Sequence, residues 1–217
     1  MKILAIDTST DYLSLAVTDG GKILGRFHRR IGRNHSSMLI PMIDSLLKKA
    51  RLKLKDIGGF VVSIGPGSFT GLRIGVATVK GLALATGKPI VAVPTLDAVA
   101  RNAGRFKGAI CPVLDARKNK LYACIYESDG KVIKRRSKYL LVSAQDLLEK
   151  IKRYDKIFFL GDGTALLGKK AGKADWYPRA EVAARLGLED FKKRKFVKAE
   201  DLEPLYIYSK ECDIIGK

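Results

Sequence analysis

The chain has 217 residues, of which 47% are hydrophobic and 29% are charged, and its formal net charge is +19. This length and composition fit a soluble globular protein of one large domain or two lobes. No apolar run approaches the roughly 20 residues that a membrane-spanning helix needs, and Asp7 ends the apolar N-terminus, so we expect neither a signal peptide nor an anchor. Three cysteines without metal-ligand spacing fit a reducing compartment, which we expect to be the cytoplasm.

The positive charge is spread along the whole chain. Residues 1–104 carry 15 Lys and Arg against 6 Asp and Glu, and residues 105–217 carry 26 against 16. The densest basic cluster, residues 192–195, is short. Spread charge favours loose attraction to polyanions over a formed groove, and no module that reads nucleic-acid sequence is visible.

The first hundred residues predict an α/β unit with the element order β-β-β-α-β-α-β. A hairpin signal, Asp19-Gly20-Gly21, separates the second strand from the third. Apolar residues recur at every third or fourth position in the first helix. The predicted elements are strands at 3–6, 12–17 and 22–30, a helix at 36–50, a strand at 59–64, a helix at 69–85 and a strand at 90–93.

The stretch Gly65 to Gly75, which reads GPGSFTGLRIG, links the fourth strand to the second helix. Ser68 or Thr70 can cap that helix. Because a glycine inside a helix costs roughly 1 kcal/mol relative to alanine, Gly71 and Gly75 need a compensating close contact. Three interpretations stay open: a phosphate cradle at the helix N-terminus, a helix shaped for close packing of another helix, or a helix packed tightly on its own sheet.

The element order partly repeats in the second half. Strands are predicted at 109–114, 121–126 and 132–139, a helix at 143–153, a strand at 157–160 and a glycine turn at 161–164. Beyond residue 171 the pattern weakens to a short helix near 180–186 and an apolar stretch at 205–208. Two tandem three-strand meanders followed by α and β elements describe the duplicated ribonuclease-H-like fold of actin-like ATPases and sugar kinases. We place one lobe at residues 1–104 and a degenerate second lobe at 105–217.

Four stretches of the N-terminal half resemble the bacterial TsaB (YeaZ) family: IDTST, NHSSMLIPMIDSLL, GPGSFTGLRIG and AVPTLDAVA. The second half is similar only through residues 160–163 and 204–206. The resemblance implies a non-catalytic scaffold and activator subunit of the machinery that makes threonylcarbamoyladenosine at position 37 of tRNA. Its implied partners are a catalytic paralogue, TsaD, and an ATPase, TsaE. Direct contact with tRNA is expected to be weak or absent.

The resemblance also implies that the first two helices pair with the partner. The second helix is apolar almost all round, so it must be covered on more than one side. We therefore predict a helical interface that forms a homodimer in isolation and a heterodimer with the paralogue. Its predicted residues are His35, Met38, Met42, Leu46, Gly71, Arg73, Gly75, Val76, Val79 and Lys80.

No catalytic residue and no metal site are predicted. The stretch 94–100, where a TsaD-like enzyme carries a histidine motif, has no histidine. The loop after the first strand, DTST, lacks the glycine that lets backbone amides approach a phosphate. We expect no cofactor on this chain alone, and ATP or ADP only at the level of the complex. The vestigial nucleotide-binding positions would be Asp7, Thr8, Ser9, Asp115, Gly161, Asp162 and Gly163.

Two other function classes remain open. One is an enzyme of the same fold, either an ATP-dependent kinase or a metallopeptidase, and the other is a self-associating structural protein. The nucleotide affinity of the isolated chain separates the scaffold from the enzyme. Copurification with a TsaD-like paralogue separates the scaffold from the structural protein.

Overall fold

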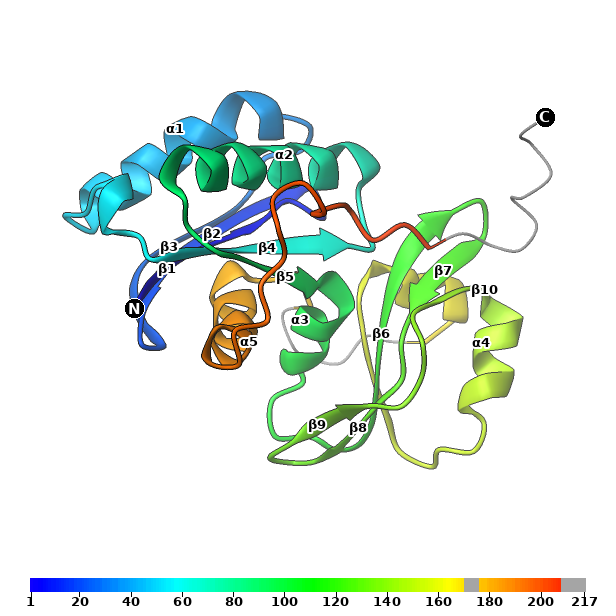
Figure 1. The fold of residues 1–217 in the computed structure, drawn as a ribbon. Coiled ribbons are helices and arrows are strands. Elements are labelled where there is room, and N and C mark those ends of the chain that lie inside the picture. Colours follow the sequence, from blue (N-terminus) through cyan, green and yellow to red (C-terminus); the bar gives the residue numbers. More distant parts are fainter. Residues whose placement is uncertain (170–175, 208–217) are drawn as a thin grey trace. The chain divides into compact units, whose positions relative to one another are not determined.

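A computed structural model describes residues 1–169 and 176–207 (Figure 1). The chain divides into two compact units: unit 1 holds residues 1–98 and 178–205, and unit 2 holds residues 99–177 and 206–217. The predicted boundary at residue 104 lies close to the first crossing between units. The assignment of residues 178–205 to the second lobe is corrected, because this segment returns to unit 1.

Unit 1 contains a five-stranded sheet of order β3-β2-β1-β4-β5. The first three strands form an antiparallel meander, and β4 and β5 continue the sheet in parallel with β1. The order and nearly all the bounds agree with the sequence prediction. The strands are β1 (Lys2–Asp7), β2 (Tyr12–Asp19), β3 (Lys22–Arg30), β4 (Gly59–Gly65) and β5 (Ile90–Pro94).

Helices cover both faces of this sheet. Because side chains alternate along a strand, Leu4 and Ile6 of β1 face α1 and α2, whereas Ile3 and Ala5 face α5. Burial on both faces explains why the central strands read as continuous apolar runs. The helices are α1 (His35–Lys49), α2 (Phe69–Thr86) and α5 (Ala180–Lys192), with a short 3-10 turn, η1, at Leu54–Asp56. A further helix, α3 (Thr95–Arg101), follows β5. Its seven residues are too few for helical periodicity to reveal it in the sequence.

Unit 2 repeats the meander with breaks. The strands β7 and β8 pair antiparallel with successive parts of β6, so the single strand predicted at 121–126 is interrupted after Ala123. Pro112 lies between the two paired parts of β6 and has no amide hydrogen to donate, which accounts for the gap. Of the predicted strand 132–139 only three residues form a strand, and another short strand follows at residues 140–143. The strands are β6 (Lys107–Arg117), β7 (Lys120–Ala123), β8 (Tyr126–Asp129), β9 (Ile133–Arg135) and β10 (Leu140–Ser143).

The rest of unit 2 follows the prediction as far as β11. Helix α4 (Ala144–Ile151) begins at the predicted cap, where Ser143 Oγ accepts a hydrogen bond from the amide of Asp146. Strand β11 (Ile157–Leu160) then pairs in parallel with β6 and leads into a 3-10 helix, η2 (Asp162–Leu167). Within the part of the chain that the structure describes, no further strand of unit 2 follows β11.

The C-terminal segment runs back across unit 1, and residues 205–207 of the apolar stretch form no strand. The amide of Leu205 donates to the carbonyl of Ile64 at 2.7 Å, and Leu202 is buried in the core beneath α2. Tyr208 lies outside the described residues. Among residues 1–169 and 176–207, no helix combines the length and apolar character needed to cross a membrane.

Candidate functional site

The N-terminus of α2 is fixed by a side-chain cap. Ser68 Oγ accepts a hydrogen bond from the amide of Gly71 at 3.3 Å, which confirms one of the two predicted capping residues. The amide of Ser68 itself donates to the carbonyl of Ser9 at 2.7 Å. The start of α2 is therefore tied to the loop between β1 and β2.

The glycines of this stretch face that same loop. A Cβ atom added to Gly67, Gly71 or Gly75 would lie 2.1 to 2.3 Å from an atom of Ser9 or Thr8. Thr8 Oγ1 donates a hydrogen bond to the carbonyl of Gly71 at 2.7 Å and closes the contact. The glycines therefore allow the chain's own β1–β2 loop to pack closely against α2. Of the three interpretations, internal packing is the one that the structure supports.

Asp7, at the end of β1, is buried beneath this loop with 1% of its surface exposed. Its Oδ1 accepts hydrogen bonds from the amide and the hydroxyl of Ser9, at 3.0 and 2.9 Å. Its Oδ2 has no partner among the described residues, and Ser63 Oγ lies nearby without a well-formed hydrogen bond. Burial raises the pKa of Asp7, and the hydroxyls of Ser63 and Ser9 offset part of that rise. The turn that Asp7 forms with Ser9 holds the predicted residues Asp7, Thr8 and Ser9 together.

Unit 2 has an equivalent cluster at the ends of β6 and β11. The amide of Asp115 donates to Asp162 Oδ1 at 2.9 Å, and burial raises the pKa of Asp162. A Cβ atom on Gly161 would lie 1.9 Å from the carbonyl oxygen of Val113, and one on Gly163 would meet the same strand. The predicted residues Asp115, Gly161, Asp162 and Gly163 thus come together. Here too, the glycines allow one segment of the chain to pack on another.

In the part of the chain that the structure describes, no three His, Cys, Asp or Glu side chains are grouped in a way that could hold a metal ion. His35 instead places Nε2 3.2 Å from the carbonyl oxygen of Tyr12, at the entry of α1. His28 stacks on the ring of Tyr12, with 4.8 Å between the ring centroids. Both histidines therefore have structural contacts within unit 1.

The predicted partner interface requires correction. Six of its ten residues are buried inside unit 1, where they contact the sheet, the β1–β2 loop or the neighbouring helix: His35, Leu46, Gly71, Gly75, Val76 and Val79. Met38, Met42 and Lys80 are half-buried, and Arg73 is exposed. A partner cannot reach the buried six without opening the unit.

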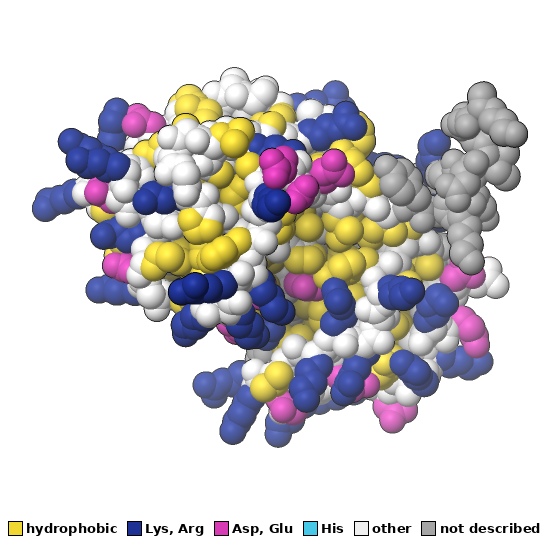
Figure 2. All heavy atoms as spheres, viewed as in Figure 1, with side chains coloured by type: hydrophobic (Ala, Val, Ile, Leu, Met, Phe, Trp, Pro, Cys, Tyr) yellow, Lys and Arg dark blue, Asp and Glu magenta, His cyan; other side chains and the backbone are white. Residues whose placement is uncertain are grey.

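The solvent-facing side of the two helices is made of other residues, which we call the outward face. Leu84 and Ile40 are 75% and 53% exposed, and Phe69 is 55% exposed with the guanidinium of Arg73 over its ring. Ala77 and Gly81 are exposed one helical turn apart, and a Cβ on Gly81 would meet no atom within 4 Å. Hydrophobic side chains are visible over α2 in Figure 2. The outward face consists of Ile40, Phe69, Ala77, Gly81, Leu84 and Ala85.

A groove adjoins the outward face. It has a volume of about 610 Å³ and lies between α1, residues 51–54 and Leu82 of α2. Most of its lining is apolar, and Ile40 belongs to both the groove and the outward face. Sequence periodicity missed this surface because it grouped Ala85 with Gly71, Gly75 and Thr78 on one side of α2, whereas Ala85 is exposed together with Ala77 and Gly81.

Known proteins show what this chain is related to. A family model described as TsaD, tRNA N6-adenosine threonylcarbamoyltransferase, matches residues 26–199. The tRNA threonylcarbamoyladenosine biosynthesis protein TsaB of Bacillus subtilis is 35% identical over 201 residues, which are 87% of this chain and 88% of that protein. The chain belongs to the TsaB family. The Escherichia coli protein of the same name is 31% identical, over 95% of this chain and 94% of its own length.

Solved structures agree with TsaB membership. YeaZ from Pseudomonas aeruginosa superposes with a TM-score of 0.81 at 25% identity, over 95% of this chain and 99% of that one. The activator of 2-hydroxyisocaproyl-CoA dehydratase from Clostridium difficile reaches a TM-score of 0.53 at 11% identity, over 95% of this chain and 100% of that one, a likeness of fold alone. Together with the two meanders, these neighbours confirm the α/β, duplicated ribonuclease-H-like fold class with a reduced second unit.

Proposed function

We propose that this TsaB-family chain is a non-catalytic subunit of the cytoplasmic assembly that makes threonylcarbamoyladenosine in tRNA. In this proposal it binds and activates a TsaD-like catalytic paralogue, and a TsaE-like ATPase is the third component. The observation that carries the proposal is the outward face of α1 and α2, an exposed apolar surface on a unit whose core is otherwise complete.

The chemistry of the outward face suits another helix pair. Exposed large apolar side chains grouped on one surface mark interaction sites, and Ile40 and Leu84 are more than half exposed. Ala77 and Gly81 leave room for a partner backbone to approach closely. A stable interface needs about 1,200–2,000 Å² of buried surface in total, which two such helices per chain can supply. A second copy of this chain offers the same face, so a homodimer forms when the paralogue is absent.

The environment of Asp7 supports a non-catalytic role. A general base or metal ligand must reach its substrate, whereas Asp7 is enclosed and its Oδ1 holds Ser9 of the same loop. The glycines at the start of α2 are in contact with Thr8 and Ser9. In this proposal, any ATP or ADP binds only at the level of the complex.

Copurification with the TsaD-like paralogue of the same organism tests the proposal. Leu84→Glu places a charge on the outward face and is expected to abolish copurification. Leu148→Glu is the matched control, because Leu148 is an exposed leucine of α4 in unit 2. The modification activity of the paralogue, measured with and without this chain, is expected to fall with Leu84→Glu and to be unchanged with Leu148→Glu. Copurification that survives Leu84→Glu contradicts the proposed surface.

The enzyme alternative has a test of its own. The isolated chain is expected to show neither ATP hydrolysis nor stoichiometric zinc or iron. Turnover by the isolated chain that disappears with Asp7→Ala would overturn the non-catalytic assignment.

A further inference from the structure

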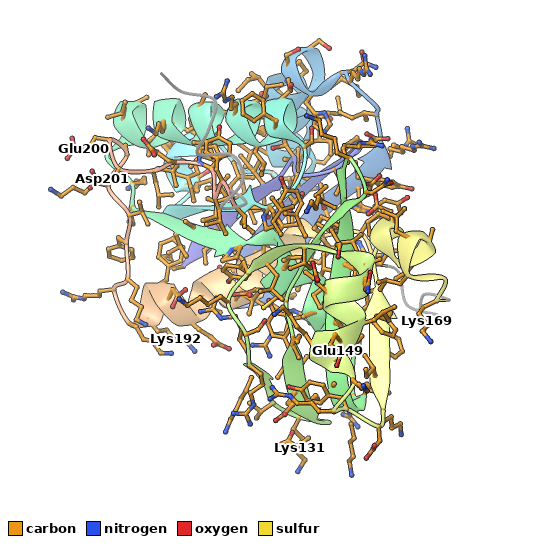
Figure 3. The ribbon with its side chains drawn as sticks, turned by 90° about the vertical axis from the view of Figure 1, so that its right-hand side faces the viewer. Lys131, Glu149, Lys169, Lys192, Glu200 and Asp201 are labelled. Atoms are coloured by element: carbon orange, nitrogen blue, oxygen red, sulfur yellow. The ribbon has the colours of Figure 1, made fainter. Side chains whose placement is uncertain are left out.

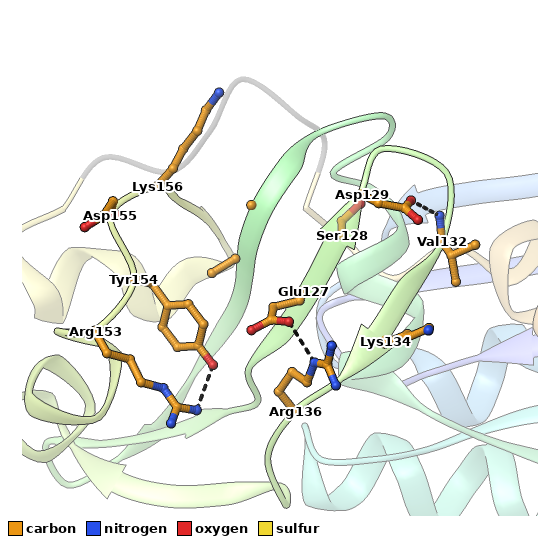
Figure 4. A pocket seen from close by; sticks show the side chains of 12 residues that line it. Glu127, Ser128, Asp129, Val132, Lys134, Arg136, Arg153, Tyr154, Asp155 and Lys156 are labelled. Carbon is orange, nitrogen blue, oxygen red and sulfur yellow. Dashed lines mark hydrogen bonds and ion pairs between the residues drawn. The ribbon is translucent and has the colours of Figure 1, made fainter.

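Unit 2 contains a groove that the partner-binding role does not use. It has a volume of about 500 Å³ and is open to solvent between the β8–β9 hairpin and the loop from α4 to β11 (Figure 4). Gly108 and Ala109 of β6 form its floor. Its lining residues are Gly108, Ala109, Glu127, Ser128, Asp129, Val132, Lys134, Arg136, Arg153, Tyr154, Asp155 and Lys156. We call it the β8–β9 groove.

The groove exists because α4 is too short to cover its sheet. Eight residues of helix span about 12 Å, whereas the eleven residues of β6 span about 36 Å. Helix α4 lies against β7, β10 and η2 and ends at Ile151. Among the described residues, α4 therefore leaves the part of the sheet that contains β8, β9 and the start of β6 uncovered on that side.

Cations surround this opening. Lys134 and Arg136 lie on the hairpin, and Arg153 and Lys156 lie on the opposite loop (Figure 4). All four side chains are exposed. The basic character extends past the lining to Lys107, whose side chain would contact a Cβ at Gly130 of the hairpin turn, and to Lys131 at the hairpin tip (Figure 3). Figure 2 shows Lys and Arg side chains gathered over β8 and β9.

Two of the three carboxylates that line the groove are bound by the chain itself, and the third, Asp155, is exposed. Glu127 Oε2 accepts from Arg136 Nε at 2.8 Å. Asp129 Oδ1 accepts from the amides of Lys131 and Val132, both at 2.8 Å, and these bonds lower the pKa of Asp129. Within the described residues, Lys107, Lys131 and Lys134 form no ion pair. The lining holds four cations against three carboxylates, and Lys107 and Lys131 beside it raise the excess of positive charge to three.

One wall also presents an aromatic ring. The Arg153 guanidinium lies 4.9 Å from the ring centroid of Tyr154, and its Nη2 donates to the Tyr154 hydroxyl at 2.9 Å. Tyr154 is half-buried against the core of unit 2, which holds its ring in place. A fixed ring beside several cations is the combination that single-stranded nucleic acids use for stacking and phosphate contact.

We propose that the β8–β9 groove binds the phosphate groups of an RNA strand without reading its sequence. The choice of RNA, as opposed to a single nucleotide, rests on the extent of the charge, which continues from the groove to Lys107 and Lys131, and on the proposed function in tRNA modification. Phosphate contacts by lysine and arginine release counterions, so binding weakens steeply as salt is added. Such a surface holds a substrate for the complex, and base recognition is left to other subunits.

The test uses the full chain and a fluorescein-labelled tRNA transcript with adenosine at position 37, with anisotropy measured from 50 to 200 mM KCl. The groove variant is Lys134→Gln/Arg153→Gln/Lys156→Gln. The control, Lys138→Gln/Lys150→Gln/Lys169→Gln, removes the same charge from exposed positions of unit 2 outside the groove. The groove variant is expected to bind about tenfold more weakly at 50 mM KCl and to lower the slope of log K against log salt by about 2, and the control by much less. Equal losses in both variants overturn the proposal in favour of diffuse attraction.

Two further measurements identify the ligand. Tyr154→Phe is expected to bind like the unmodified chain, and Tyr154→Leu about fivefold or more weakly, because stacking needs the ring and not the hydroxyl. Circular dichroism checks that both variants fold. Displacement of the tRNA by 1 mM ADP would show that the groove takes a free nucleotide and would overturn the RNA assignment.

The paralogue copurification described above is repeated with the groove variant. The groove and the outward face lie in different units, so copurification is expected to persist. Groove-dependent tRNA binding without copurification would refute the proposed function and would still support RNA binding in the β8–β9 groove. Copurification without groove-dependent tRNA binding would support the proposed function and refute RNA binding in the groove.

Discussion

The two sides of α2 carry the same kind of residue and put it to different uses. On the inward side, Gly71 and Gly75 lie against Thr8 of the β1–β2 loop. On the outward side, Ala77 and Gly81 lie in solvent with no atom of the chain against Gly81. A row of small residues on a helix indicates close approach by some backbone. It does not say whether that backbone belongs to the same chain or to a partner.

The largest expected difference between the two sides is seen with a charged side chain. Val76 is 4% exposed and packs in the core with Leu39 and Val79, whereas its neighbour Ala77 faces solvent. Val76→Glu buries an unpaired carboxylate and is expected to destabilise the chain by about 4 kcal/mol or more, a large part of the roughly 5–15 kcal/mol that stabilises an ordinary protein. Ala77→Glu is expected to change the free energy of unfolding by no more than about 0.5 kcal/mol.

Urea unfolding followed by circular dichroism measures the free energy of unfolding of both variants, and sedimentation measures their oligomeric state. Ala77→Glu is expected to yield a folded monomer in place of the dimer that we propose for the unmodified chain. A folded Val76→Glu variant that also dissociates would show that the inward side is the interface after all.

A smaller loss is expected from one methyl group on the inward side. In Gly71→Ala the added carbon would lie 2.1 Å from the backbone oxygen of Thr8, which cannot rotate away as a side chain can. The β1–β2 loop must shift, and we expect a cost of about 3 kcal/mol. Denaturant titration checks this. A loss below about 1 kcal/mol would mean that the loop yields readily, contrary to the packing described.

Much of this fold could be predicted from the sequence because its elements are long and their signals local. The strands of unit 1 appear as apolar runs between glycine turns, and α1 has a clear helical period. The breaks in unit 2 could not be predicted in the same way. The gap after Ala123 depends on Pro112 standing beside it on the neighbouring strand, and that pairing is visible only in three dimensions.

The candidate sites show the same limit. Composition correctly indicated that α2 is covered on more than one side, but which side faces the sheet depends on the position of Thr8, 63 residues from Gly71 along the chain. The β8–β9 groove left no sequence motif at all. It follows from the short length of α4 and from two loops that the fold places opposite each other.

Beneath the loop that the inward side contacts, Asp7 at the end of β1 is a buried ionisable group that makes the stability depend on pH. Unfolded, Asp7 titrates near 3.8, and burial raises its pKa in the folded chain. Between these two pKa values the folded state binds more protons, so stability falls as the pH rises through that window and stays lower above it. Asp7→Asn removes the charge, keeps an oxygen for Ser9 and offers an amide toward Ser63. We expect it to stabilise the chain by about 1–3 kcal/mol at pH 7, and by less near pH 4.

Urea titrations of both proteins at pH 4 and pH 7 measure this difference. Ser63→Ala serves as the control, because it alters the same buried polar contact and leaves the carboxyl in place. If Asp7→Asn destabilises the chain more at pH 7 than at pH 4, the folded state favours the ionised carboxylate, which contradicts the prediction.

The smallest effect separates the two sides most cleanly, because it uses the same substitution on the outward side. Gly81→Ala adds a methyl group where no atom lies within 4 Å, and alanine is favoured over glycine inside a helix by about 0.5–1 kcal/mol. We therefore expect Gly81→Ala to stabilise the isolated chain by that amount, opposite in sign to Gly71→Ala ten residues earlier in the same helix.

If a partner helix approaches Gly81 closely, the same methyl group weakens copurification with the paralogue while the thermal midpoint of the chain alone rises. Opposite movements of these two quantities are the expected signature of a glycine kept for a partner. If Gly81→Ala raises the midpoint and leaves the pull-down unchanged, the partner lies elsewhere on the outward face, and Leu84 becomes its centre.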